Sequence, residues 1–389
     1  MTQYDFDTPI ERRHTDCFKY DALPAMYGRD DLLPMWVADM DFRSPDFVID
    51  AIRQRCNHPV LGYTMPSTPY WTAVTSWLAN HYNIHTDKDT LHFIPGIVAG
   101  ISYALLCLTQ PGDKVLVTTP VYPPFLNLPK DSGRTLVCSP LKIANSRFSI
   151  DFDDFERKAA DCKVFIMSNP HNPAGTVWGE ETLLHIADIC HRHNILVISD
   201  EIHADLTLPA HRHISYSTIS PIAANHSITF VAPSKTFNIA GLGSSVCYIY
   251  NKKLRQRFFG WLDALGVAGG NIFAFVAAEA AFSHGQEWLK QMLDYLSANV
   301  QSLDRFLKQH LPSVKAVLPE ASYLAWLDFS AYGIPHNELT SRFINEAHIV
   351  LNDGTTFGGD AYQGCFRLNI GCPNQMLLDA LQRIASVLP

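Results

Sequence analysis

The sequence predicts an α/β protein in which helices flank a mostly parallel sheet, with a smaller α+β domain beside it. Short β-branched runs alternate with helical patterns through the middle of the chain, and polar and turn residues collect where these runs end. Such alternation is typical of a parallel sheet that is covered on both faces. The runs expected as buried strands are residues 91–94, 115–119, 164–168, 195–199, 228–232 and 246–250.

The segments between these strands carry the spacing of helices. Apolar side chains recur every three or four residues at Val98, Ile101, Leu105 and Leu108, and again between residues 183 and 190. Ligands of such sheets bind beyond the carboxyl ends of the strands. We therefore expect the functional site in the loops that follow the strands.

The pattern changes near residue 286, where a second domain is expected to begin. We expect residues 46–285 to form the large domain, and residues 1–45 together with 286–389 to form the small one. The elements predicted in the C-terminal part are an amphipathic helix through Leu289, Leu293, Leu296, Val300, Leu303 and Leu307, strands at 323–329 and 366–370, a Gly-rich loop at 354–364 and a final helix at 375–387.

The composition is that of a large globular protein with an acidic balance. The 389 residues include 30 Lys and Arg against 38 Asp and Glu, which gives a formal net charge of −8. An acidic chain with no basic block is a poor binder of nucleic acid and of anionic membranes. The most apolar stretch, residues 272–282, is about half as long as a membrane span and contains Glu279. We therefore expect neither nucleic acid nor a membrane as a partner.

The cysteines indicate a reducing compartment. They number nine, and no C-x-x-C occurs, which is typical of free thiols that pack as small hydrophobes. The first residues of the sequence contain no apolar run of the kind found in a secretory signal. The expected location is the cytoplasm.

Three polar residues at predicted strand ends are candidates for one site. Lys235 follows a buried strand, where a desolvated amine becomes a nucleophile or Schiff-base former; the alternative is a solvated surface lysine. Asp200 is either the counter-ion of a buried cation, such as a protonated pyridine nitrogen, or a helix N-cap. His203 lies close enough to share the site, and the alternative for it is an ordinary, partly exposed histidine.

Other turns carry groups that suit a planar, phosphorylated ligand. Residues 169–175 (NPHNPAG) form a proline-locked turn that either fixes an amide donor or simply ends a strand. Tyr122 offers a flat ring, and residues 96–99 leave backbone N–H groups free for a phosphate. Neither a P-loop nor a dinucleotide fingerprint is present, so the phosphate belongs to a ligand other than ATP or NAD.

Arg367 lies in an apolar predicted strand and needs an anionic partner there. That partner is either an internal Asp or Glu, or a substrate carboxylate held by two hydrogen bonds. The histidine pairs at 191/193 and 211/213 have no carboxylate or cysteine companion in the sequence nearby, and we expect no metal site.

Taken in order, these segments resemble the fold-type I pyridoxal 5′-phosphate (PLP) enzymes of the class I/II aminotransferase superfamily. Within it, the chain is most similar to the MalY/PatB-like cystathionine β-lyase, or C–S lyase, branch. The resemblance covers nearly the whole chain. It rests on six motifs: 35–42 (MWVADMDF), 95–98 (PGIV), 169–173 (NPHNP), 200–203 (DEIH), 234–242 (SKTFNIAGL) and 367–373 (RLNIGCP).

The resemblance implies a role for each candidate residue. Lys235 would attach the cofactor covalently and move protons, Asp200 would keep the pyridine nitrogen protonated, and Arg367 would bind the substrate α-carboxylate. The other implied contacts are Asn172 on the ring O3′ with His203 nearby, Tyr122 stacked on the ring, Val98, Ala99, Ser234 and the partner subunit's Tyr63 on the phosphate, and Trp36 and Val37 on the substrate. No cation follows within 236–242, so backbone groups and hydroxyls would hold the phosphate.

The activity implied is β-elimination from cystathionine, cystine or other cysteine S-conjugates, which releases a thiol, pyruvate and ammonia. The family resemblance also implies a homodimer with shared active sites. Two alternatives stay open: an aminotransferase with the same cofactor contacts, and a regulatory binding protein that uses this fold. The motifs at 35–42 and 200–203 favour the lyase.

Overall fold

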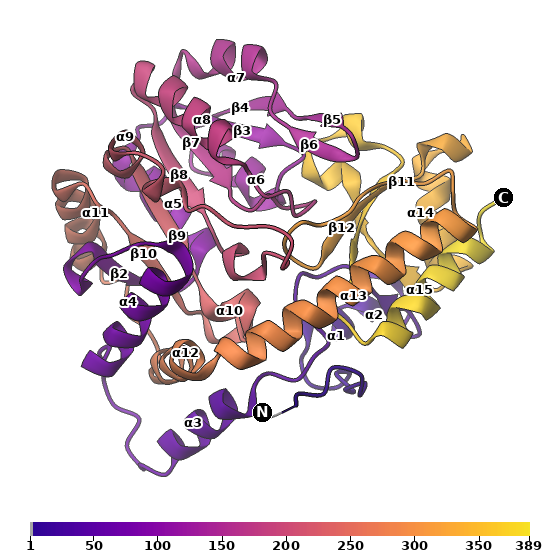
Figure 1. Cartoon of the computed structure of the whole chain (residues 1–389), viewed down its shortest axis with the longest axis horizontal. Helices are drawn as coiled ribbons and strands as arrows, with labels where there is room; N and C mark the ends of the chain where they lie inside the picture. The colour runs from indigo at the N-terminus through magenta and orange to yellow at the C-terminus, as the bar shows by residue number, and fades with distance from the viewer. Residues whose placement is uncertain (1–2) are drawn as a thin grey trace.

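A seven-stranded sheet forms the centre of the computed structural model, which describes residues 3–389 (Figure 1). Its strand order is β2-β10-β9-β8-β7-β3-β4. The strands from β9 to β4 pair in parallel, whereas β10 is antiparallel to both of its neighbours. The strands are β2 (Leu91–Ile94), β3 (Lys114–Thr119), β4 (Thr135–Pro140), β7 (Cys162–Ser168), β8 (Leu196–Asp200), β9 (Ser227–Val231) and β10 (Ser245–Tyr248).

Helices cover both faces of this sheet, as the sequence predicts. Val164 and Ile166 of β7 pack in one apolar cluster with Ile101, while Phe165 between them packs in another with Leu183. This division arises because successive side chains of a strand point to opposite faces. The first face is covered by α5 (Ile97–Leu108), α6 (Pro123–Asp131) and α11 (Lys252–Leu265), and the second by α7 (Phe152–Ala159) and α8 (Glu180–Arg192).

A second, antiparallel sheet with the order β11-β12-β15-β14 lies in the C-terminal part of the chain. Its strands are β11 (Lys315–Val317), β12 (Leu324–Asp328), β14 (Asn352–Asp353) and β15 (Cys365–Asn369). The long helix α13 (Gln286–His310) runs from the neighbourhood of α12 (Ile272–His284) toward this sheet and packs along α15 (Asn374–Ser386) (Figure 1). Helix α14 (His336–Asn345) packs on β13 (Ile349–Val350).

The N-terminal segment joins the C-terminal part through a two-stranded parallel pair. In it, β1 (Leu33–Pro34) pairs with β13. The proposed division of the chain at residues 46 and 286 stays a prediction. The other elements are α1 (Phe18–Asp21), α2 (Leu23–Tyr27), α3 (Asp46–Cys56), α4 (Thr68–Tyr82), α9 (Pro221–Asn225), α10 (Pro233–Thr236), α12 (Ile272–His284) and the hairpin of β5 (Lys142–Ala144) and β6 (Arg147–Ser149).

Two differences from the sequence prediction have clear causes. Strand β8 includes Asp200, because the ladder continues to the pair Ser168–Asp200 beyond the apolar run. Strand β4 was not predicted, because it is an edge strand with partly exposed side chains and has no continuous apolar run. Alternation alone therefore located the strands with buried side chains, including β2 at the other edge, but not the partly exposed β4.

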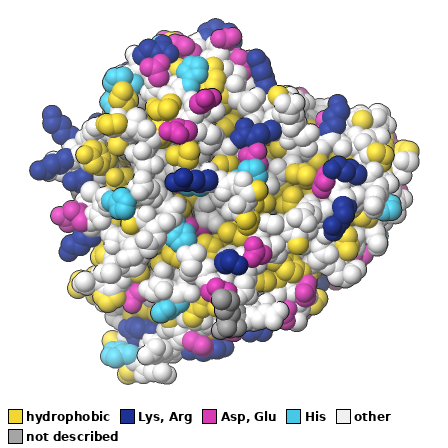
Figure 2. Space-filling view, in the orientation of Figure 1, with side chains coloured by type: hydrophobic (Ala, Val, Ile, Leu, Met, Phe, Trp, Pro, Cys, Tyr) yellow, Lys and Arg dark blue, Asp and Glu magenta, His cyan; other side chains and the backbone are white. Residues whose placement is uncertain are grey.

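The surface shows no large area of one charge on the face drawn in Figure 2, where acidic and basic side chains are interspersed. Within residues 3–389, no helix combines the length and the apolar character needed to cross a membrane.

Candidate active site

A cavity of about 220 Å³ lies at the edge of the central sheet where the parallel strands end. Loops after β2, β3, β7, β8 and β9 contribute to its wall, as the sequence predicts. The start of β10 also reaches it, because an antiparallel strand brings its amino end to that edge. The lining residues are Ala38, Pro95, Gly96, Ile97, Val98, Tyr122, Asn172, Asp200, Ile202, His203, Ala232, Ser234, Lys235, Ala240, Gly243, Ser244 and Ser245.

Lys235 extends into this cavity from the short helix α10. Its Nζ donates a hydrogen bond of 2.5 Å to the backbone carbonyl of Ala38. Burial lowers the pKa of Lys235 to about 8, and the charges of Asp39 and Asp200 only partly oppose that effect. The neutral amine is therefore accessible close to physiological pH, as a Schiff-base-forming lysine requires.

Asp200 is the last residue of β8 and faces the same cavity. One carboxylate oxygen accepts from the backbone N–H of Ile202 at 3.1 Å, so the residue also caps the following turn. Burial raises the pKa of Asp200 to about 7, and the charge of Glu201 adds to the rise. A cation placed against this carboxylate would favour its ionised form.

His203 is buried rather than partly exposed. The residue is 3% exposed, and its Nδ1 has no hydrogen-bond partner among residues 3–389. Burial lowers the pKa of His203 to about 3, and the charges of Lys235 and Arg367 act in the same direction. The alternative of an ordinary surface histidine is wrong, and the ring is a neutral hydrogen-bonding group.

Arg367 lies in β15 and is held by neutral acceptors. Its Nη1 donates to Asn172 Oδ1 at 2.9 Å, and its Nη2 donates to the carbonyl of Trp36 at 3.1 Å and to Asn352 Oδ1. No carboxylate of residues 3–389 forms an ion pair with it, so the internal Asp or Glu bridge is wrong. Burial lowers the pKa of Arg367 to about 10. Its charge remains available for an anion.

The hydrogen bond from Arg367 also fixes the orientation of the Asn172 side chain. Its oxygen accepts from Arg367, and its backbone N–H is held by Ser168 Oγ at 3.1 Å. The amide nitrogen is consequently left as a donor. The turn at residues 169–175 therefore presents an amide donor in addition to ending strand β7.

An anion-binding corner is formed by α5 and two serines. Gly96 is the N-cap of α5 and supplies no side-chain cap, so the first N–H groups of the helix stay open toward the cavity. Val98 lines the cavity, whereas Ala99 does not. Ser234 lies beside them, and Ser244 adds a buried hydroxyl without a partner among residues 3–389. We missed Ser244, although a GSS sequence directly before a strand was a usable signal.

Tyr122 lies on the wall of the cavity at the start of α6. Its ring packs edge-on against Phe125, with centroids 5.7 Å apart and an interplanar angle of 81°. This contact leaves a ring face available for a planar ligand.

Trp36 and Ala38 reach the site through their backbone carbonyls, which accept from Arg367 and Lys235. The Trp36 indole packs with Leu23, Leu32 and Val350, and its Nε1 donates to the carbonyl of Lys19 at 3.0 Å. Neither Trp36 nor Val37 lines the cavity. Their implied contacts with the substrate stay predictions.

The segment at 37–40 is held by two asparagines that the sequence argument did not single out. Asn369 Nδ2 donates to the carbonyls of Val37 and Asp39 at 2.6 and 2.7 Å. Asn238 accepts from the N–H of Met40 at 3.0 Å. Both lie within the quoted motifs.

Tyr63 lies outside the cavity of its own chain. It is fully exposed in the connection between α3 and α4, with Val60, Leu61 and Met65 also exposed nearby. Its implied contact with a cofactor requires a second chain and stays a prediction.

The cavity therefore brings together an amine of lowered pKa, a buried carboxylate, an aromatic ring and an open helix N-terminus. The Arg367 guanidinium lies behind the lining residue Asn172, to which it donates a hydrogen bond. The two unpartnered groups, His203 Nδ1 and Ser244 Oγ, line the cavity as well. This set fits a flat heteroaromatic aldehyde that carries a phosphate.

Comparison with known families agrees with this geometry. The aminotransferase class I and II family matches residues 32–384, and the chain belongs to this family.

The chain is also similar to individual proteins of known name. The chain is 41% identical to cystathionine beta-lyase PatB of Bacillus subtilis over 99% of this chain and 100% of that protein. The structure of cystalysin from Treponema denticola, which contains pyridoxal 5′-phosphate, matches with a TM-score of 0.95 at 32% identity, over 99% of each chain. The PLP-bound C-S lyase of Staphylococcus hominis matches with a TM-score of 0.92 at 35% identity, over 100% of this chain and 98% of that one.

Proposed function

We propose that this protein is a PLP-dependent C–S β-lyase that cleaves cystathionine or related cysteine S-conjugates to a thiol, pyruvate and ammonia. The observation that carries the proposal is the cavity that Lys235 and Asp200 line, with Arg367 directly behind its wall and hydrogen-bonded to the lining residue Asn172. The similarity to PatB and to PLP-bound C-S lyases supports the lyase over other members of the family.

The residues present fit pyridoxal 5′-phosphate. Lys235 would hold it covalently, Asp200 would face its ring nitrogen, and Asn172 Nδ2 would donate to its ring oxygen. The N-terminus of α5 with Ser234 and Ser244 would hold the phosphate. When bound, this cofactor supplies an electron sink for a carbanion at the substrate α-carbon.

The chain's own groups then account for substrate binding and proton movement. Of the five N–H groups of Arg367, three donate to protein acceptors, and the Nε–H has no partner among residues 3–389. Arg367 would bind the α-carboxylate through the donors left free, which would orient the α-carbon. With the cofactor bound, the Lys235 amine would take the α-proton onto Nζ. The C–S bond would break with its electron pair leaving on sulfur, and the thiolate would be protonated on release. One water would then hydrolyse the remaining 2-aminoacrylate to pyruvate and ammonia.

The assembly we propose is a cytoplasmic homodimer with shared active sites and a small amino-acid substrate. The support is the exposed segment with Val60, Leu61, Tyr63 and Met65, which places apolar side chains in solvent unless a second chain covers them.

The deciding experiment is an assay of thiol and pyruvate from cystathionine with no keto acid present. A lyase releases both products stoichiometrically, whereas an aminotransferase gives none without an amino acceptor. Lys235→Ala is expected to abolish release, and Lys290→Ala, a surface lysine paired with Asp294, should retain it. Turnover that depends on added keto acid would favour the aminotransferase.

A further inference from the structure

Lys235 is carried by a helix of a single turn. Helix α10 spans only Pro233–Thr236, and its N-cap, Ala232, makes no side-chain hydrogen bond to the first turn. One helical turn is not stable by itself, because fixing its backbone costs more free energy than its few hydrogen bonds return. The direction in which Lys235 extends into the cavity therefore depends on contacts between α10 and the rest of the chain.

Thr236, the residue after Lys235, makes such a contact with Asp205. Thr236 is 0% exposed, and its Oγ1 donates a hydrogen bond of 2.9 Å to Asp205 Oδ2. Successive side chains of a helix point about 100° apart around its axis. A fixed Thr236 hydroxyl therefore fixes the rotation of α10, and with it the direction of the Lys235 side chain.

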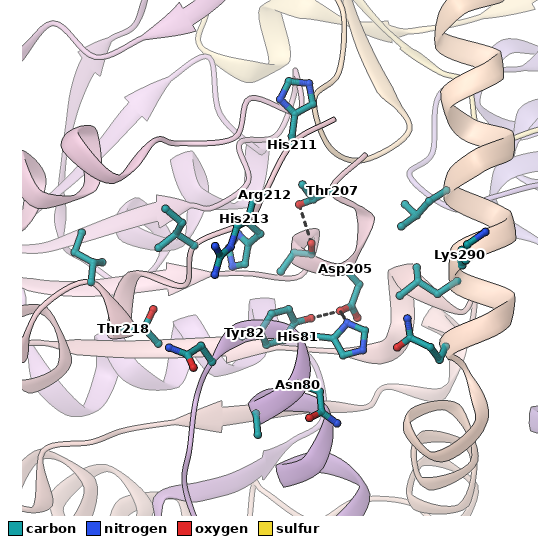
Figure 3. A pocket seen from close by; sticks show the side chains of 18 of the residues that line it. Asn80, His81, Tyr82, Asp205, Thr207, His211, Arg212, His213, Thr218 and Lys290 are labelled. Carbon is teal, nitrogen blue, oxygen red and sulfur yellow. Dashed lines mark hydrogen bonds and ion pairs between the residues drawn. The ribbon is translucent and has the colours of Figure 1, made fainter. Parts of the chain in front are cut away.

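The Asp205 carboxylate is itself held by two further donors. Its other oxygen accepts from Trp77 Nε1 at 3.0 Å and from the Tyr82 hydroxyl at 2.5 Å, both on α4. The Asp205 side chain is 1% exposed, although the residue lies on the wall of a surface pocket of about 770 Å³, where Figure 3 shows Tyr82 and His81 beside it. His81 Nδ1 lies 3.9 Å from the carboxylate, which is beyond hydrogen-bond distance. Three donors hold the carboxylate in place, because loss of any of them leaves a buried polar group unpaired.

Asp205 also belongs to the segment that carries two other groups of the cavity. It lies in the short turn directly after His203 and five residues after Asp200, and this turn packs on α10. Among residues 3–389, no other side-chain hydrogen bond joins residues 200–206 to α10. The hydrogen bond from Thr236 therefore ties the helix that carries the amine to the segment that carries the carboxylate and the imidazole of the cavity.

We propose that Asp205, through Thr236, sets the position of the Lys235 amine relative to Asp200 and His203. Asp205 and Thr236 are positioning residues rather than catalytic ones, since neither lines the cavity. The inference rests on the cofactor attachment in the proposed function, because the amine that they position is the one that would hold the cofactor.

The test measures how fast PLP becomes covalently attached to the cofactor-free protein at saturating PLP, followed by visible absorption. Thr236→Val removes the hydroxyl and keeps the branched shape, whereas Thr236→Ser keeps the hydroxyl. Asp205→Leu removes the acceptor, and a double variant combines Asp205→Leu with Thr236→Val. Ser139→Ala is the matched control, because it removes a buried hydroxyl that donates to Asp154 Oδ2 at 2.8 Å, away from the cavity wall. Thermal unfolding, and kcat and KM for cystathionine, are measured on the same preparations.

Thr236→Val should slow attachment and lower kcat by about tenfold to 100-fold, because displacement of a reacting group by about 1 Å can cost that much. KM should change little, since Arg367 lies on β15 and not on α10. Thr236→Ser should attach PLP at nearly the parental rate, and Asp205→Leu should be as slow as Thr236→Val. The double variant should be no slower than either single variant, because both changes break the same link. Ser139→Ala should lower the Tm and leave both rates unchanged.

Parental attachment by folded Thr236→Val would overturn the inference, whatever its Tm, because the hydroxyl would then serve stability alone. Attachment in Thr236→Ser as slow as in Thr236→Val would overturn it as well, and so would a double variant slowed by the product of the two single effects. If Asp205→Leu does not fold, the two Thr236 variants decide, and if Thr236→Val does not fold, Thr236→Ala takes its place. A parent that attaches PLP but releases no thiol and pyruvate from cystathionine would overturn the proposed function, while the attachment rates would still decide the inference.

Discussion

Arg367→Lys tests the assignment of the carboxylate-binding group. Arg367 makes three hydrogen bonds, all to uncharged acceptors, and has no ion pair within residues 3–389. A lysine keeps the charge but cannot present two N–H groups in one plane. Loss of one charge-assisted contact to the substrate costs about 1.5–3 kcal/mol, which corresponds to roughly 10- to 150-fold in kcat/KM.

The same change also has a structural effect. Asn172, Asn352 and the Trp36 carbonyl lose their guanidinium donors, and a hydrogen bond to a charged group contributes about 1.5–3 kcal/mol, of which the lysine ammonium replaces a part. We therefore expect a variant that folds and binds PLP with a lower Tm. Arg305→Lys is the control, because Arg305 is exposed on α13 with a single hydrogen bond to Ser302, and it should be neutral in both assays.

Kinetics and thermal unfolding should be measured on one preparation. The two substrates are cystathionine and its derivative in which the α-carboxylate of the cysteine half is converted to a carboxamide. The parent should use the amide poorly, and Arg367→Lys should lower its turnover little further. An unstable Arg367→Lys protein with parental kinetics in the cold would refute the assignment, because it would show that Arg367 serves the fold alone.

Three further outcomes follow from the site. Asn352→Asp places a carboxylate against Arg367, so KM should rise by about tenfold or more with a smaller change in kcat; an unchanged KM would contradict the open charge of Arg367. The pKa of Lys235 is lowered to about 8, so its neutral amine appears at lower pH than in an ordinary lysine; the rate of PLP addition should rise with a midpoint near pH 8 and level off about one unit above it, and a midpoint near the usual 10.5 would argue against burial as the cause. Mixed subunits of Lys235→Ala and Tyr63→Ala should regain activity, since one site of the hybrid has both residues; verified exchange without recovery would exclude a shared site.

The sequence motifs predicted many of the residues that line the cavity. Lys235, Asp200, His203, Asn172 and Tyr122 all lie on it, as predicted. Each follows or ends a strand, and parallel strands bring their carboxyl ends to one edge. Local sequence is sufficient for this inference because the geometry of a parallel sheet is regular.

Contacts between distant segments were not predictable in the same way. Asn352 reaches Arg367, Ser244 enters from the start of an antiparallel strand, and the Trp36 indole points into a separate apolar cluster. Nothing in the local pattern of these residues specifies their neighbours.

By itself, the sequence determined the alternation of strands and helices, the order of the motifs and hence the family. Only the tertiary structure decided which charged and polar groups meet: among residues 3–389 no carboxylate pairs with Arg367, whereas the Glu201 carboxylate lies 3.0 Å from His213 Nε2. The physical reason is that the ionisation of a buried group depends on burial and on the charges that surround it in space. Those neighbours come from segments far apart in the chain, and their positions are fixed only when the sheets and helices pack.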